Sequence, residues 1–261
     1  METLVTIVLA AGCLAAAGGD ANAAAPLKVL LLAGRNNHNW KATTPVLAKT
    51  LDGSGLFKTT VLEDPAKMTP EMLAGFDAIV SNWCAFPKVE ERPWGEAPEK
   101  AFLDFVKGGK GVVFVHAATA TFHNWPEFMA LAGGTWGKGT HHGANGEAMR
   151  VFAADPNHPI AKGIPAFAHA DELWRSVAWQ KDVHVVFRAK PAGEKARPAA
   201  AEGEPVAVCT KLGKGRGFYL VLGHDTKAME RPGFKLLLLR GTQWAAAGKV
   251  TVPVPPDLPK P

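Results

Sequence analysis

Apolar runs alternate with amphipathic stretches along the first half of the chain. Continuous apolar runs, beginning with residues 28–33, are typical of parallel strands that are covered on both faces. Between them, apolar residues recur every three or four positions, the spacing of a helix that buries one face. The predicted strands are 28–33, 58–63, 77–81 and 111–116, and helices are predicted over 43–51, from Thr69, over 99–107 and over 125–132. This order predicts a parallel sheet with helices on both faces.

In the second half of the chain, short connections replace most of the helices. The strand pattern occurs at 147–152, 183–189, 205–211 and 217–222. The glycine-rich segment 212–216 between the last two strands indicates a hairpin. The sheet is therefore expected to gain antiparallel strands on one side. A closing helix is predicted over 232–246, and no repeat or low-complexity linker divides the chain, so we expect a single domain over 24–261.

The first 23 residues have the pattern of a secretory signal peptide. Residues 4–17 are apolar but too short and glycine-rich for a good membrane span, and small residues up to Ala23 fit a cleavage site. Glu2, with no Lys or Arg beside it, departs from the usual pattern. Cys13 lies in a faint lipoprotein-box pattern, so lipid anchoring at Cys13 stays open beside plain export. The protein is expected in the periplasm or outside the cell, without a transmembrane span.

The composition is that of a globular domain and argues against nucleic-acid binding. The apolar content is 47% and the charged content 20%. The net charge is +5, but the 29 Lys and Arg residues are scattered, whereas a nucleic-acid footprint needs them on one face. Cys84 and Cys209 lack the spacing of a zinc or redox motif. They could pair in an oxidising compartment or remain separate buried thiols on different strands.

Histidines occur where the predicted strands end. His38 follows the first strand, His116 ends the fourth and His224 follows the last. The carboxyl ends of parallel strands line one crevice of an open sheet, where ligands bind. Histidine suits both proton transfer near neutral pH and metal binding. We therefore expect these three residues to share one site, as acids, bases or metal ligands. No Ser or Cys follows His116 in the turn 116–121, which argues against a Ser or Cys hydrolase.

Carboxylates and a second histidine pair add candidates to this site. Asp225 can orient the neighbouring His224 or bind metal itself. Asp171 and Glu172 can bind sugar hydroxyls or act as a base, although acids are equally common in the first turn of a helix. Because adjacent residues of an extended segment point opposite ways, at most one of His141 and His142 reaches the site, and we select His142.

Tryptophans in or near the same loops suit stacking on a sugar ring. They equally suit core packing, which is the better interpretation for two of the four, Trp40, Trp83, Trp125 and Trp136. The predicted substrate contacts are Asn39, Trp40, Trp83, Thr119, Trp125, His142 and Asp171.

Six short motifs follow one another along nearly the whole chain after the leader. They are 37–40 (Asn-His-Asn-Trp), 114–118 (Phe-Val-His-Ala-Ala), 125–128 (Trp-Pro-Glu-Phe), 155–164, 171–174 (Asp-Glu-Leu-Trp) and 213–224. Together they resemble the ThuA-like (trehalose utilisation) family. The resemblance implies a flavodoxin-like, class I glutamine amidotransferase-like three-layer sandwich, with a mostly parallel sheet. It also implies an elbow without the amidotransferase cysteine, at Ala117-Ala118. Thr121 departs from relatives that often carry an acid there.

The same resemblance implies work on oxidised (3-keto) glycosides and, in some members, a divalent metal such as zinc. It carries functional roles onto His38, His116, Asp171, Glu172 and His224, and no nucleotide cofactor is expected. We therefore favour an exported hydrolase, lyase or isomerase of sugar catabolism, in which His116 and His224 act as acid, base or metal ligands. Glu172 or Asp225 would orient them.

Two other functions stay open. One is a non-catalytic carbohydrate-binding protein that uses the tryptophans as platforms. The other is a glycoside hydrolase with two facing carboxylates, drawn from Asp171, Glu172 and Asp225. A homo-oligomer is compatible with each function.

Overall fold

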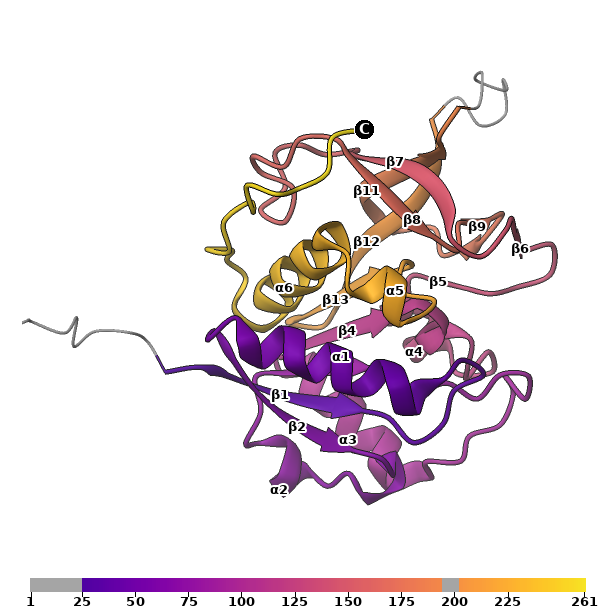
Figure 1. Cartoon of the computed structure of the whole chain (residues 1–261). Helices are drawn as coiled ribbons and strands as arrows, with labels where there is room; N and C mark the ends of the chain where they lie inside the picture. The colour runs from indigo at the N-terminus through magenta and orange to yellow at the C-terminus, as the bar shows by residue number, and fades with distance from the viewer. Residues whose placement is uncertain (1–24, 194–201) are drawn as a thin grey trace, which may run out of the picture.

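A nine-stranded mixed sheet forms the centre of the molecule in a computed structural model, which describes residues 25–193 and 202–261 (Figure 1). The strand order is β2-β1-β3-β4-β13-β12-β11-β7-β8. The predicted signal peptide, and Cys13 within it, lie outside the described residues.

The sheet has a parallel half and an antiparallel half. The parallel half consists of β1 (Leu27–Leu32), β2 (Phe57–Leu62), β3 (Ala78–Ser81), β4 (Gly111–Val115) and β13 (Gly215–Leu220). Beyond β13 the neighbours pair antiparallel, and they are β12 (Glu204–Leu212), β11 (His184–Pro191), β7 (Glu147–Ala153) and β8 (Phe167–Asp171). The turn at 213–214 joins β12 to β13 as the predicted hairpin.

Helices cover both faces of the sheet, so the predicted three-layer sandwich is confirmed. One face packs against α1 (Trp40–Gly53) and α6 (Pro232–Ala247), and the other against α3 (Glu96–Lys107) and α4 (Pro126–Ala132) (Figure 1). Alternate residues of β1 serve the two cores: Val29 and Leu31 face one, Leu30 and Leu32 the other. Two faces buried at once explain why the inner parallel strands β1, β3 and β4 are largely apolar runs, whereas the edge strand β2 is mostly exposed or half-buried.

The elements predicted from the pattern are all present, with ends that differ by at most three residues. Four short helices complete the fold, namely η1 (Pro65–Lys67), α2 (Pro70–Leu73), η2 (His116–Thr119) and α5 (Thr226–Met229). There are also two small antiparallel ribbons. In one, β5 (Gly134–Thr135) pairs with β10 (Ala178–Trp179), and in the other, β6 (His141–His142) pairs with β9 (Trp174–Arg175).

The sequence pattern did not predict β8, because its inward positions include the polar His169 and Asp171 beside Phe167, and this hides the usual apolar alternation.

Cys84 and Cys209 are both buried and are not bonded to each other. Within the described ranges, no helix combines the length and apolarity that a membrane crossing requires.

Candidate functional site

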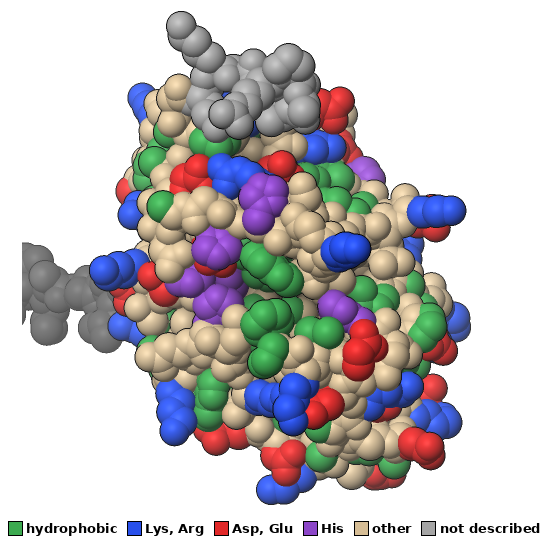
Figure 2. Space-filling view, turned by 90° about the vertical axis from the view of Figure 1, so that its right-hand side faces the viewer, with side chains coloured by type: hydrophobic (Ala, Val, Ile, Leu, Met, Phe, Trp, Pro, Cys, Tyr) green, Lys and Arg blue, Asp and Glu red, His purple; other side chains and the backbone are tan. Residues whose placement is uncertain are grey.

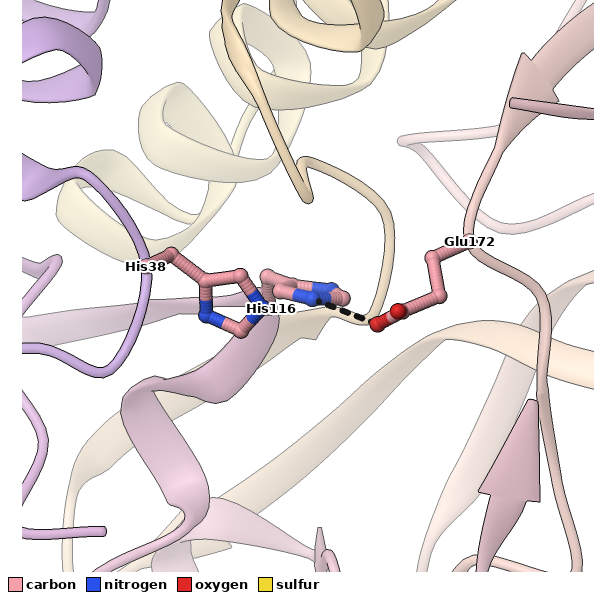
Figure 3. A group of neighbouring side chains, drawn as sticks. All are labelled: His38, His116 and Glu172. Carbon is pink, nitrogen blue, oxygen red and sulfur yellow. Dashed lines mark ion pairs between the residues drawn. The ribbon is translucent and has the colours of Figure 1, made fainter. Parts of the chain in front are cut away.

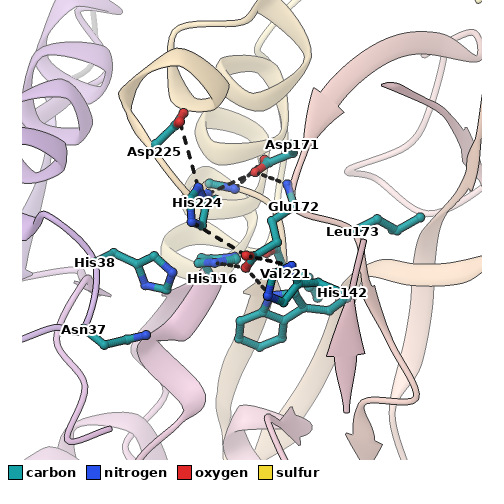
Figure 4. Close-up of polar contacts among 12 residues, drawn as sticks. Asn37, His38, His116, His142, Asp171, Glu172, Leu173, Val221, His224 and Asp225 are labelled. Carbon is teal, nitrogen blue, oxygen red and sulfur yellow. Dashed lines mark hydrogen bonds and ion pairs between the residues drawn. The ribbon is translucent and has the colours of Figure 1, made fainter. Parts of the chain in front are cut away.

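Four segments bring histidines and one carboxylate together at the carboxyl ends of the strands. His38 follows β1, His116 follows β4, His224 follows β13 and Glu172 follows β8 (Figure 4). The His38 ring lies edge-on to the rings of His116 and His224, with centroid distances of 4.7 and 4.8 Å. Histidine side chains gather in one place on this face of the molecule, beside hydrophobic side chains (Figure 2). The predicted convergence of the three histidines is therefore present.

His116 directly follows β4, is the first residue of η2 and has a left-handed backbone. Its φ is 49°, a region that non-glycine residues rarely adopt, and its side chain is buried. A sharp strand-to-helix turn of this kind presents the nucleophile in α/β-hydrolases. The elbow residue is therefore His116 itself, one position before the Ala117-Ala118 pair where the resemblance led us to expect it.

The tautomer of His116 follows from its contact with a backbone carbonyl. Nδ1 lies 2.7 Å from the carbonyl oxygen of Val221, which can only accept, so Nδ1 carries the hydrogen. Nε2 turns toward Glu172 Oε2, 3.2 Å away, and has no hydrogen-bond partner among the described residues (Figure 3). In the neutral ring Nε2 has a lone pair, so a lone pair and a carboxylate oxygen face each other. This arrangement favours a cation, either a proton or a metal ion, between the two atoms.

Glu172 is the centre of the cluster and is 5% exposed. Its Oε2 accepts a hydrogen bond of 2.8 Å from Trp174 Nε1. Its Oε1 lies 3.1 Å from His142 Nδ1 and 3.7 Å from His224 Nε2 (Figure 4). Burial alone raises the pKa of this carboxyl, but the His116 ring and the Trp174 N–H outweigh burial and lower the pKa to about 2. Glu172 is thus ionised at neutral pH.

Burial lowers the pKa of His38, whereas burial alone raises the pKa of Glu172. Burial, and then the positive charge that His116 and His224 can carry, lower the pKa of His38 to about 3. His38 is therefore neutral at pH 7, the form in which imidazole binds metals.

Asp171 connects β8 to the turn that carries His224. Its Oδ1 accepts from the backbone N–H groups of Glu172 (2.8 Å) and His224 (3.1 Å). Its Oδ2 accepts from the Gly223 N–H (2.6 Å) and lies 3.2 Å from His169 Nε2. Burial raises the pKa of Asp171, but the His169 ring, the charge that His116 can carry and the Gly223 N–H outweigh burial and lower the pKa. Both oxygens are used inside the protein and the residue is 1% exposed, so the predicted substrate contact at Asp171 is wrong.

A small cleft opens beside the cluster, with a volume of about 200 Å³. One side is polar, and Trp136 and Trp174 form an aromatic wall in which their ring centroids lie 4.9 Å apart. The lining residues are Asn37, His38, Phe86, Ala117, Ala120, Trp136, His142, Glu172 and Trp174. Aromatic faces beside a few polar groups are the usual lining of a small-molecule site.

The family model ThuA, described as trehalose utilisation, matches residues 28–245. The chain belongs to the ThuA family. A solved structure of a putative ThuA-like protein from Parabacteroides merdae is 29% identical, with a TM-score of 0.76 over 90% of this chain and 95% of that chain. A putative ThuA-like protein from Bacteroides uniformis, 22% identical with a TM-score of 0.62 over 89% of this chain and 98% of that chain, shares the fold. A search of the curated proteins found no match. The family description points to a sugar-related role.

Three predicted tryptophan contacts of this ThuA-family chain lie away from the cleft. Trp83 and Trp125 are 4% and 3% exposed and stack on Phe122 and Phe128, with centroid distances of 5.6 and 5.5 Å. Their ring faces are covered, which agrees with the core-packing interpretation, the better one for two of the four tryptophans, and leaves no face open for sugar stacking. Trp40 begins α1 and is not among the cleft residues.

Asn39 and Thr119 also have roles other than the predicted substrate contact. The side chain of Asn39 caps α1 by accepting from the Ala42 N–H at 3.3 Å. Thr119 is fully buried, and its carbonyl accepts from the Thr135 hydroxyl at 2.6 Å.

The predicted difference between His141 and His142 matches their positions. His142 lines the cleft and contacts Glu172, whereas His141 Nδ1 lies 3.0 Å from the Gly139 carbonyl and is not a lining residue. Asp225 differs from its prediction. It lies 3.9 Å from His224 Nδ1, too far for a hydrogen bond, and its Oδ1 caps α5 by accepting from the Ala228 N–H at 2.8 Å.

Several cleft residues were not among the substrate contacts predicted from the sequence. Trp174 lay inside a motif and Trp136 was one of the four tryptophans considered, but neither was selected as a contact. Asn37 and Phe86 come from loops whose direction depends on the folded chain.

Proposed function

We propose that this ThuA-family protein is an enzyme of sugar catabolism that acts on an oxidised (3-keto) glycoside or a related sugar by histidine acid–base chemistry, with a divalent metal in its cleft. One observation carries the proposal: histidines from separate segments of the chain surround a single buried, ionised carboxylate, Glu172, beside an aromatic wall. The family description, trehalose utilisation, supports a sugar as the substrate class. The apolar leader at 1–23 supports export of the enzyme.

The donor set fits a divalent metal such as zinc. His38, His116 and Glu172 each offer one ligand atom, and these atoms lie within 4.8 Å of one another. Two histidines and one carboxylate, with a position left for water or substrate, are a common set in catalytic zinc sites. The buried Nε2 of His116, facing a carboxylate without a hydrogen bond, supports the same assignment. When bound, the metal would supply a Lewis acid that polarises the sugar carbonyl.

His142 and His224 remain for proton transfer. Both lie beside Glu172, and their side chains are 38% and 18% exposed, so they can exchange protons with water. The C–H next to a ketone is acidified, and an imidazole ring is chemically suited to removing that proton. Trp136, which is partly exposed and lines the cleft, would hold the apolar face of the sugar ring.

The geometry gives less support to a hydrolase with two facing carboxylates. Glu172 is the only carboxylate that lines the cleft in the described part of the chain. The oxygens of Asp171 are occupied by the protein, and Asp225 caps a helix. A second carboxylate across the scissile bond, which this mechanism needs, is therefore not available in the cleft.

Turnover is the direct test. Purified protein should consume 3-keto-glucosides, leave the unoxidised glucosides intact, lose activity with a chelator and regain it with zinc. If no sugar in a broad panel is consumed with any divalent metal while sugars still bind, the protein is a carbohydrate-binding protein and the enzymatic proposal is wrong.

Thermal unfolding tests the metal site without an assay of activity. Zinc at a hundred times its Kd should stabilise the folded protein by about 2.7 kcal/mol. For a chain of this size that raises Tm by roughly 5–10 °C. His116→Ala should abolish the shift, and His158→Ala, which changes a histidine outside the cleft, should keep it. An equal shift in both variants would place the binding elsewhere.

A further inference from the structure

One side-chain oxygen of Asn36 lies against both the backbone N–H and the ring of His38. The backbone N–H of His38 donates to Asn36 Oδ1 at 2.9 Å, and His38 Nδ1 lies 3.2 Å from the same oxygen. Both residues belong to the loop that follows β1. The contact is therefore short-range, and it holds the imidazole relative to its own backbone.

The orientation of the Asn36 amide follows from its other end. Asn36 Nδ2 lies 2.9 Å from the backbone carbonyl of Asn82, just after β3. A carbonyl only accepts, so the amide nitrogen must face Asn82 and the amide oxygen must face His38.

Asn82 itself is firmly held. It is 3% exposed, and its side-chain nitrogen donates to the hydroxyls of Thr43 and Thr44 at 3.0 Å each. Its backbone N–H donates to the carbonyl of Leu32 at 2.9 Å, at the end of β1. The acceptor that orients Asn36 is thus anchored to two neighbouring strands and to the first turn of α1.

We propose that Asn36 is a positioning residue that keeps His38 in the tautomer with the hydrogen on Nδ1, and thereby leaves the Nε2 lone pair free toward the cleft. An amide oxygen that already accepts one N–H can accept a second from Nδ1, but it repels a lone pair there. Metal-bound histidines usually donate their other ring N–H to such an acceptor. The consequence for metal binding rests on the proposed function, whereas the tautomer itself does not.

His116 provides an internal comparison. Its Nδ1 hydrogen is held by the backbone carbonyl of Val221, which no side-chain substitution removes. His38 depends on a side chain for the same purpose. A change at Asn36 should therefore alter the tautomer of His38 and leave that of His116 as it is.

Nitrogen–proton correlation NMR of the metal-free protein tests the proposal, because the two ring nitrogens give different shifts in each tautomer. The His38 signals are assigned by their loss in His38→Ala. We expect the Nδ1–H form for His38 and His116 in the wild type, and a change to mainly Nε2–H for His38 alone in Asn36→Leu. Asn39→Ala, which removes the cap of α1 in the same loop, is the matched control and should leave both rings unchanged.

The tautomer of His38 decides the proposal. A wild-type His38 in the Nε2–H form overturns the proposal even if Asn36→Leu does not fold, and so does an Asn36→Leu variant that keeps the Nδ1–H form. Calorimetry with Zn²⁺ alone should show binding weakened by about 10- to 100-fold in Asn36→Leu. Unchanged affinity would overturn the positioning role. If the wild type binds no Zn²⁺, the proposed metal fails, and NMR alone decides the role of Asn36.

Discussion

Two groups of histidines on this protein have similar spacing and different surroundings. The cleft cluster consists of His38, His116, His142 and His224 around Glu172. The outer pair consists of His158 and His184 with Asp155. Ring centroids are 4.7 Å apart for His38 and His116, and 5.4 Å apart for His158 and His184. Each group has a close carboxylate, since His184 Nε2 lies 3.0 Å from Asp155 Oδ2.

The two groups differ in burial and in which ring nitrogen carries the hydrogen. The His116 side chain is 3% exposed, and that of His184 is 54% exposed. The Ile160 N–H donates to Nδ1 of His158, so this nitrogen carries the lone pair, the reverse of His116. His158 also packs on Trp244 of α6, with ring centroids 5.1 Å apart. His158 thus connects a turn to α6, and the outer pair differs from the cleft cluster in lacking a buried carboxylate such as Glu172.

The largest expected difference between the two groups is in catalysis. His116→Gln removes the ring nitrogen that faces Glu172, so turnover of a keto-glycoside should fall by about a hundredfold or more. His184→Gln is the matched change in the outer pair, and its kcat/KM should remain that of the wild type. Initial rates, with circular dichroism to confirm folding, measure both. Comparable losses in the two variants would remove the distinction between the groups.

A smaller contrast lies within a single dipeptide. His142→Ala removes a ring that contacts Glu172 at the cleft, so we expect about a tenfold loss of kcat/KM, equivalent to about 1.4 kcal/mol. His141→Ala changes the neighbouring residue, which lies outside the cleft lining, and should have no effect on the rate. Steady-state kinetics on the two variants compare them directly, and the reverse order would mean that the cleft is not where the sugar reacts.

The smallest expected effect concerns the outer pair itself. The Asn157 N–H and the His184 ring lower the pKa of the Asp155 carboxyl below its ordinary value. The stability that this carboxylate contributes is therefore complete above the unfolded pKa of about 3.9 and is lost as the pH falls through the folded pKa.

Asp155→Asn should thus lower the urea midpoint slightly at about pH 6 and not at about pH 2. The effect is small because the pair is exposed to solvent. Urea unfolding at both pH values is the measurement. An equal loss at both would show that the side chain acts by packing, not by charge.

The fold could be predicted largely from the sequence because most strands pack apolar residues on two faces. Within the nine-stranded sheet, β8 is the strand that the pattern missed, and it shows the limit of that reasoning. His169 and Asp171 lie on its buried face, and they replace the apolar residues by which a strand is recognised. Their buried contact, with 3.2 Å between His169 Nε2 and Asp171 Oδ2, becomes visible only after the chain has folded.

The site could be predicted in part, for a related reason. Strand ends meet at one edge of a parallel sheet, so the positions of His38, His116 and His224 follow from topology. The direction of a side chain does not follow from topology. The sequence allowed either sugar stacking or core packing for Trp83 and Trp125, and they are core residues because their rings turn toward Phe122 and Phe128.

The left-handed backbone at His116 is a source of instability that cannot be removed without changing the cleft. A non-glycine residue held at φ 49° costs about 1–3 kcal/mol, a sizeable fraction of the stability of a typical domain. Glycine would relieve that strain and would remove the imidazole that faces Glu172. Thermostability and function therefore compete at this position, and a stabilised variant must gain its added stability elsewhere in the molecule.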